Sequence, residues 1–189
     1  MACTVWEDFW NWSEFYPGAK EVVPSDAPKA LGIPVTMACF VDADFASCKA
    51  TRRSHTGVII YLNNAPIIWF SKRQTTVETS TFGSEFVAMR IAIEVVEGLR
   101  YKLRMMGVPI NGSTNMYCDN ESPVLTNVTR PESPWKKKHN TVAYHKAREA
   151  IAAKTIRIAK EPGDSNPADL MTQLMEGEVF RNHFKRYMW

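Results

Sequence analysis

Four acidic residues occur where the surrounding sequence is mainly apolar. Asp42 and Asp119 each end an apolar predicted strand. Glu85 lies near the apolar side of a long predicted helix, and Asp169 lies in the first turn of the last predicted helix. An ionised carboxylate at the edge of a core is costly unless positive charge compensates it. Four such groups would repel one another, and Mg²⁺ or Mn²⁺ is the hard cation that oxygen ligands of this kind bind. The pattern predicts a carboxylate site for two divalent ions about 3.5–4 Å apart, which could activate a water molecule and stabilise the leaving oxygen of a phosphodiester.

Each acid also has a local interpretation. Asp42 and Asp119 could form turns at the ends of their strands, because Asp is a common turn residue. Glu85 and Asp169 could stabilise the first turns of their helices by interacting with the helix dipole. Hydrophobic periodicity alone does not show that the four side chains converge, so both interpretations stay open at this point.

The elements that would position these acids follow from apolar periodicity and turn residues. In a predicted strand, apolar residues either alternate with polar residues or form a continuous run. In a predicted helix, apolar residues recur every three to four positions. We predict strands at 35–42, 56–62, 66–70, 115–119 and 155–160, and helices at 81–106, at 138–153 and from Asn166-Pro167 onward. Gly107 and Pro109 should end the long helix. The predicted order is β-β-β-α-β-α-β-α.

The 189 residues are enough for one domain with a sizeable core. We assign residues 1–34 to an aromatic-rich linker segment and residues 35–189 to the domain. The linker carries six aromatic residues between Trp6 and Tyr16, which should either pack back on the domain or dock on a missing partner. Apolar runs are too short to cross a bilayer, and the N-terminus does not resemble a signal peptide. We therefore expect an intracellular protein with no membrane partner.

Basic residues are concentrated in two regions, although the net charge is only +3. Residues 49–73 carry five Lys or Arg and no acid, and residues 136–160 carry eight against the single Glu149. This distribution is compatible with a polyanionic partner and equally with a solvated surface. The four cysteines have neither CxxC spacing nor Cys/His metal spacing, so we expect no zinc site and no disulfide framework.

Five sequence motifs resemble the ribonuclease H domain at the end of the Pol polyprotein of copia-type (Pseudoviridae) LTR retrotransposons. In chain order they read VDADFASCKATRRSHTG, APIIWFSKRQTTVETSTFGSEFVA, MYCDNES, KKKHNTVAYHKARE and NPADLMT. The N-terminal WSEFYPGAKE is similar to the stretch that links this domain to reverse transcriptase. The resemblance implies an α/β fold of the ribonuclease H type, with three α/β/α layers around a mixed five-stranded sheet.

The resemblance also implies an activity and its residues. An endonuclease of this family hydrolyses the RNA strand of RNA–DNA hybrids with two Mg²⁺ or Mn²⁺ ions and leaves 5′-phosphate products. The residues that match the catalytic, metal-binding acids are Asp42, Glu85, Asp119 and Asp169. Asp44 matches the second acid of the first motif, and we do not expect it to be a ligand. No small-molecule cofactor is implied.

Candidate nucleic-acid contacts follow from the same motifs and from charge. Asn120 and Ser122 follow Asp119 and could contact a 2′-hydroxyl or a phosphate, since hybrid duplexes are recognised by shape and 2′-hydroxyls. Basic candidates for the phosphate backbone are Arg52, Arg53, Lys72, Arg73, Lys136, Lys137 and Lys138. His139 and His145 are six residues apart on one predicted helix, so a shared metal site is not expected, and we favour a structural or substrate-contacting role.

Alternative functions remain open on the sequence. A non-catalytic hybrid-binding or tethering module, the remnant of a domesticated or degenerate retroelement, would keep the fold without cutting. A nuclease of another type on the same fold, an integrase or junction resolvase, is a weaker alternative. The implied partners are an RNA–DNA hybrid and a reverse transcriptase domain of the same polyprotein. The implied location is cytoplasmic, in a retrotransposon particle, or nuclear.

Overall fold

A mixed five-stranded sheet organises the computed structural model, which describes residues 12–118 and 141–188. The sheet order is β3-β2-β1-β4-β5. β1 pairs antiparallel with β2, which pairs antiparallel with β3, whereas β1 and β4 are parallel, as are β4 and β5. The strands are β1 (Met37–Ala43), β2 (His55–Leu62), β3 (Ala65–Arg73), β4 (Thr114–Cys118) and β5 (Ile156–Lys160).

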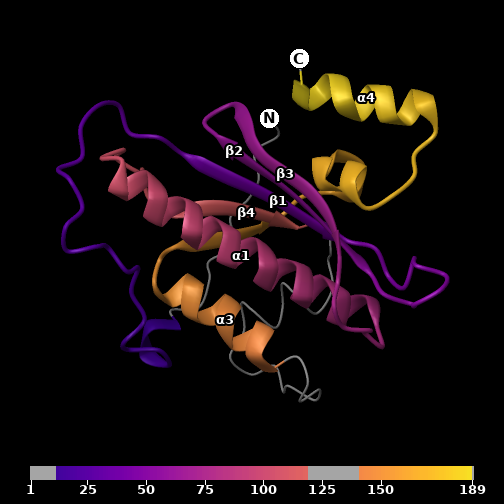
Figure 1. The fold of residues 1–189 in the computed structure, drawn as a ribbon, viewed down its shortest axis with the longest axis horizontal. Coiled ribbons are helices and arrows are strands. Elements are labelled where there is room, and N and C mark those ends of the chain that lie inside the picture. Colours follow the sequence, from indigo (N-terminus) through magenta and orange to yellow (C-terminus); the bar gives the residue numbers. More distant parts are fainter. Residues whose placement is uncertain (1–11, 119–140, 189) are drawn as a thin grey trace.

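Helices lie on both faces of this sheet. α1 (Thr81–Met105) and α3 (Thr141–Ala152) contribute to the larger apolar core, together with inward residues of the strands. The short 3-10 helix η4 (Pro167–Met171) packs on the opposite face, where Ala168 joins a second apolar cluster. Figure 1 shows α1 and α3 along the sheet, and α4 (Gly177–Met188) beyond the short coil of η4. The remaining 3-10 helices are η1 (Trp12–Glu14) and η3 (Gly163–Ser165).

The central strand β1 is apolar on both faces because both are covered. Successive side chains of a strand point to opposite faces of the sheet. Cys39 and Val41 belong to the core under α1, whereas Phe40 belongs to the cluster on the η4 face. Asp42 follows in the same alternation and therefore lies on the η4 face. This is the element that carries the first predicted acid.

The 25-residue helix α1 begins and ends where its capping residues predict. The Ser80 side chain accepts a hydrogen bond from the backbone N–H of Gly83, as an N-cap does. Gly107 has a φ of 71°, a left-handed conformation typical of the residue after a helix. Within the described ranges no helix is both long and apolar enough to cross a membrane.

The predicted element order and fold class are confirmed, with one correction at the C-terminal end. The sequence predicted one last helix opening at Asn166-Pro167, but the structure has the five-residue η4, a break, and then α4. The prediction of the helix start was right, because the Asn166 side chain accepts from the Ala168 N–H and Pro167 follows. It was wrong about the continuation, because Thr172 turns toward Asp42 instead of extending the helix.

The N-terminal segment packs against the domain in the part that is described. Trp12 is only 1% exposed, and the guanidinium carbon of Arg148 on α3 lies 3.9 Å from the centre of its ring. The same carbon lies 3.9 Å from the ring of Tyr144, so Arg148 is stacked between two aromatic rings. Of the two alternatives for the aromatic residues, packing on the domain or docking on a partner, Trp12 therefore shows the first. Trp6, Phe9 and Trp10 lie outside the described residues, and the boundary at 34/35 stays a prediction.

A second attachment of this segment is an ion pair with α1. Glu21 accepts hydrogen bonds from Arg100 at 2.7 and 2.9 Å and from Arg104 at 2.6 and 3.2 Å. Arg100 is 3% exposed and also donates to the Gly112 carbonyl and the Thr114 hydroxyl. Burial alone would raise the pKa of Glu21, but the hydrogen bonds from the two guanidinium groups outweigh it and lower the pKa from 4.5 to about 2.

We expect Glu21→Gln to lower the free energy of unfolding at pH 7 by about 2 kcal/mol, because it leaves the buried Arg100 charge without its counterion. Since the folded-state pKa is depressed, the contribution of Glu21 is present above pH 4.5 and is lost as the pH falls toward about 2. Chemical denaturation from pH 2 to pH 7 measures both effects.

Glu94→Gln is the matched control. It removes an exposed i,i+4 ion pair with Arg90 on the same helix and should cost no more than about 0.5 kcal/mol. Equal losses for the two variants would contradict a specific role of Glu21.

Candidate active site

η4 is attached to the end of β1 by a buried asparagine. The Asn166 side chain is 0% exposed and donates from Nδ2 to the Val41 carbonyl at 3.2 Å. Its Oδ1 accepts from the Ala168 N–H at 3.1 Å and so caps η4. One side chain therefore fixes both where η4 starts and where that start lies on the sheet. Val41 is the residue directly before Asp42.

A second attachment occurs at the other end of η4. The Thr172 hydroxyl donates to Oδ2 of Asp42. The Thr172 N–H donates to the Asp169 carbonyl at 3.1 Å. Thr172 thus joins the turn that carries Asp169 to the side chain of Asp42, although the two acids are far apart in the sequence.

A glycine in β2 makes room for η4. Gly57 pairs with Asp42 across the β1–β2 ladder, so a side chain at either position faces the same side of the sheet. A Cβ atom at Gly57 would lie 2.7 Å from the Ala168 carbonyl oxygen and 2.8 Å from Cγ2 of Thr172. η4 can lie this close to the sheet only because position 57 has no side chain. Sequence reasoning missed Gly57, although a glycine within a β-branched strand is a known signal of close approach.

Both acids held in this way are buried. Asp42 is 7% exposed and Asp169 is 8% exposed, and the Oδ1 atom of Asp169 is shielded from solvent. Burying carboxylates is unfavourable unless the site provides compensation. Through Thr172 the structure therefore links Asp42 to the turn that carries Asp169; these are two of the four acids that the sequence singled out.

Glu85 belongs to α1, which packs on the face of the sheet opposite η4. It is half-buried in α1, and its Oε2 atom is shielded from solvent. The buried Gln74 joins the start of α1 to the sheet, since its Nε2 donates to the Ser84 carbonyl at 2.8 Å and to the Thr56 hydroxyl at 3.1 Å. Thr56 pairs with Ala43, the residue after Asp42. The first turn of α1 holds no acid, so the helix-dipole interpretation of Glu85 was wrong. Asp169 does lie in the first turn of η4, as that interpretation requires.

The fourth acid, Asp119, lies outside the described residues. The strand before it is described, and there Cys118 pairs with Val41 in the parallel β1–β4 ladder. The last pair of this parallel ladder thus lies, on each strand, on the residue directly before a predicted ligand. Among residues 12–118 and 141–188, no three His, Cys, Asp or Glu side chains are grouped as a metal site.

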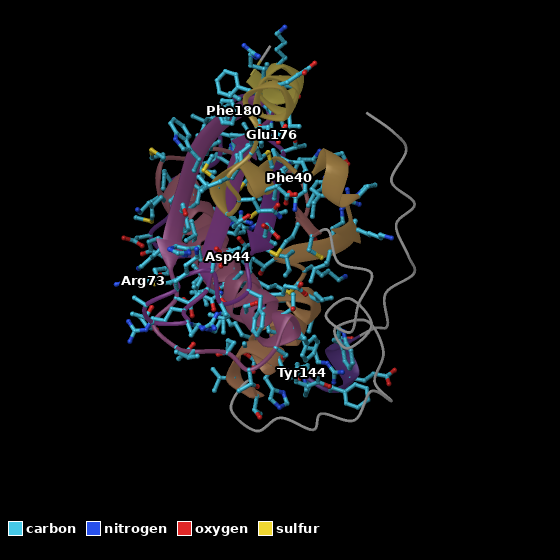
Figure 2. The ribbon with its side chains drawn as sticks, turned by 90° about the vertical axis from the view of Figure 1, so that its right-hand side faces the viewer. Phe40, Asp44, Arg73, Tyr144, Glu176 and Phe180 are labelled. Atoms are coloured by element: carbon cyan, nitrogen blue, oxygen red, sulfur yellow. The ribbon has the colours of Figure 1, made fainter. Side chains whose placement is uncertain are left out.

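Asp44 makes structural contacts in the loop that follows β1. Its carboxylate accepts a hydrogen bond from the His55 backbone N–H, and its Oδ2 lies 3.1 Å from His55 Nδ1. Ser47 Oγ lies 2.9 Å from the same ring nitrogen. Asp44 therefore closes the loop between β1 and β2. Figure 2 shows Asp44 and Arg73 at similar heights in the view, and His55, which contacts Asp44, pairs with Arg73 of β3.

The described basic candidates gather at this end of the sheet. Lys72 pairs with Thr56, which pairs with Ala43, so Lys72 lies two strand spacings, about 10 Å, from the end of β1. Lys72 and Arg73 are exposed and line a groove of about 600 Å³ between the end of β3 and α1. Arg52 is exposed and Arg53 half-buried in the loop that leads into β2. The other nucleic-acid candidates, Asn120, Ser122, Lys136, Lys137 and Lys138, lie outside the described residues.

His145 contacts the N-terminal segment. Its Nδ1 lies 2.6 Å from the Tyr16 hydroxyl, and its ring packs edge-on against Tyr144. These contacts favour the structural alternative among the roles considered for it. His139 lies outside the described residues.

Comparison with known proteins identifies relatives among mobile elements. The chain is 25% identical over 151 residues to the retrovirus-related Pol polyprotein from transposon RE1 of Arabidopsis thaliana, a match that covers 80% of this chain. It is 28% identical over 141 residues to that from transposon TNT 1-94 of Nicotiana tabacum, covering 75% of this chain. The chain is a relative of the retrotransposon Pol polyproteins. It spans about a tenth of the length of these two relatives (10% of each). No family model matches the chain.

Solved structures give the fold of this Pol relative. The RNase H1 of the halophilic archaeon Halobacterium salinarum NRC-1 superposes with a TM-score of 0.55 at 12% identity, covering 78% of this chain and 98% of that one. LC11-RNase H1, solved in complex with an RNA/DNA hybrid, also gives 0.55, at 15% identity, covering 72% of this chain and 94% of that one. The predicted resemblance to retrotransposon Pol and the predicted ribonuclease H fold are both confirmed.

We expect Gly57→Ala to destabilise this Pol relative by about 2 kcal/mol, because the added methyl group meets the Ala168 backbone at 2.7 Å and η4 must move. Thermal or chemical unfolding measures the loss. Gly98→Ala in α1 is the control, because nothing lies within 4 Å of its added Cβ, and it should stabilise the protein by about 0.5–1 kcal/mol. A neutral Gly57→Ala variant would show that η4 does not sit tightly on β2.

Proposed function

We propose that this chain is a divalent-metal-dependent endonuclease that hydrolyses the RNA strand of RNA–DNA hybrids during retrotransposon reverse transcription. The observation that carries the proposal is the attachment of η4 to the end of β1, in which Thr172 links the buried Asp42 carboxylate to the backbone of the turn that carries the buried Asp169. The similarity to Pol polyproteins and the fold shared with RNase H1 structures support it. One of those structures is a complex with an RNA/DNA hybrid.

The donor set fits a hard cation. All four proposed catalytic ligands, Asp42, Glu85, Asp119 and Asp169, are carboxylates, and carboxylate oxygens are the ligands that Mg²⁺ and Mn²⁺ prefer. When bound, two such ions would supply an activated water and neutralise the leaving 3′-oxygen. The register that pairs Val41 with Cys118 supports including Asp119 in the set.

The protein's own residues have separate tasks in this proposal. Asn166 and Thr172 attach η4 to β1 and so fix the turn that carries Asp169 relative to Asp42, and Gly57 lets η4 lie directly on the sheet. Fixing ligands before substrate arrives reduces the reorganisation that the reaction requires. Lys72 and Arg73 lie on the same end of the sheet, where they can contact backbone phosphates on either side of the scissile bond.

The proposed partners are the hybrid and a reverse transcriptase domain of the same polyprotein, in a cytoplasmic particle or the nucleus. The alternative is a module that binds the hybrid without cutting it. The two differ only in the use of the four carboxylates, because both need the fold and the basic end of the sheet.

We expect Mg²⁺-dependent cleavage of a uniformly labelled RNA–DNA hybrid, with 5′-phosphate products. Asp42→Asn and Asp119→Asn should each lower the rate by at least about 100-fold, because each removes a charged ligand. Gel analysis of the products with Mg²⁺ and with EDTA measures both effects. Asp44→Asn, which weakens only the loop contact with His55, should keep most of the activity at a temperature where it is folded.

Tight hybrid binding without cleavage by the folded wild-type protein would favour the binding module. Efficient cleavage by both Asp42→Asn and Asp119→Asn would contradict the carboxylate site. Duplex DNA assayed beside the hybrid tests the weaker alternative of an integrase-like or resolvase-like nuclease.

We expect the affinity of the double variant Lys72→Gln, Arg73→Gln for the hybrid to depend less steeply on salt concentration than that of the wild-type protein. The slope of log K against log salt should fall by about 2, because each lost phosphate contact removes about 0.9. Fluorescence anisotropy in Ca²⁺ or EDTA, across a salt series, measures the slope. Lys102→Gln, at the other end of α1, should leave the slope unchanged, and equal effects of the two variants would show that binding is not localised.

A further inference from the structure

Thr172 is a described residue that contacts both Asp42 on β1 and the η4 turn that carries Asp169. Its hydroxyl donates to Oδ2 of Asp42 and lies 3.3 Å from the Asp169 carbonyl oxygen. Its backbone N–H donates to the same carbonyl at 3.1 Å. Thr172 therefore ends the turn that carries one acid and binds the side chain of the other.

The conformation of Thr172 is determined by the residues around it. Its Cγ2 atom lies against Gly57, 2.8 Å from where a Cβ would be, while its hydroxyl faces Asp42. Because Thr is branched at Cβ, placing the methyl group also places the hydroxyl. The start of η4 is held separately by Asn166 on the Val41 carbonyl. Rotation of the hydroxyl away from Asp42 would move the methyl group out of the space above Gly57.

The hydrogen bond has a specific consequence for Asp42. A hydroxyl that donates to an ionised carboxylate makes a short, charge-assisted bond, which favours one rotamer of the acceptor. Asp42 is buried, which strengthens this hydrogen bond relative to one made in water. A fixed donor on Oδ2 therefore opposes rotation of the Asp42 carboxylate.

We propose that Thr172 is a positioning residue that holds Asp42 through Oδ2 and so assigns the contact with a divalent cation to Oδ1. This inference rests on the proposed function, because it concerns the same site. Thr172 itself is not placed on the cation or the substrate. Loss of a hydrogen bond to a metal ligand typically lowers metal affinity by 10- to 100-fold.

Two variants separate the hydroxyl from the methyl group. Thr172→Val keeps the shape against Gly57 and removes the donor, whereas Thr172→Ser keeps the donor and removes the methyl group. Isothermal titration of the nucleic-acid-free protein with Mg²⁺ alone should give an affinity about 10-fold weaker for Thr172→Val and within about threefold of wild type for Thr172→Ser. A purely structural role would give the reverse order or equal losses.

A second measurement does not depend on the metal. In crystal structures of the two variants grown in EDTA, the Asp42 carboxylate should change rotamer in Thr172→Val and keep it in Thr172→Ser. An unchanged Asp42 together with unchanged Mg²⁺ affinity in Thr172→Val overturns the inference. Failure of the wild-type protein to bind Mg²⁺ overturns the proposed function and the cation contact assigned to Oδ1. Binding without cleavage overturns the nuclease assignment but not the role of Thr172.

Discussion

The two-point attachment of η4 to the end of β1 is the constraint on which the rest of the site depends. Asn166 bonds to the Val41 carbonyl at the start of η4, and Thr172 bonds to the Asp42 carboxylate at its end. Both bonds require η4 to lie directly on the sheet, and only the missing side chain at Gly57 allows this. Five residues of 3-10 helix thus determine how Asp169 lies relative to Asp42.

The two sides of the sheet serve different purposes. On one side, α1 and α3 bury a large apolar core that stabilises the fold. On the other, the apolar cluster around Phe40 and Ala168 is small, and it includes neighbours of two proposed ligands, Asp42 and Asp169. The N-terminal segment adds to the first side through Glu21 and Trp12, whose contacts reach α1 and α3. The larger apolar core and two of the proposed ligands, Asp42 and Asp169, therefore lie on different faces of the sheet, joined through β1.

Local signals in the sequence predicted most of the elements and all four candidate acids. The β-branched run of β2, the helical spacing after Ser80 and the glycine after α1 each act within a few residues of the element they specify. The extension of β3 through Ser71, Lys72 and Arg73 was missed, because these exposed edge-strand residues follow no apolar alternation. The break after η4 was missed for a different reason. Asn166 and Pro167 specify where a helix starts, but its end depends on Gly57 and Asp42, which are more than a hundred residues away.

The central claim is that Asp42 and Asp169, joined through η4, hold a divalent cation at the end of β1. Diffraction from crystals soaked in Mn²⁺, measured at a wavelength where manganese scatters anomalously, tests it most directly. The account predicts an anomalous peak about 2.2 Å from carboxylate oxygens of both Asp42 and Asp169, as expected for a small divalent ion. Ordered carboxylates with no peak between them, or a peak only at other acids, would contradict it.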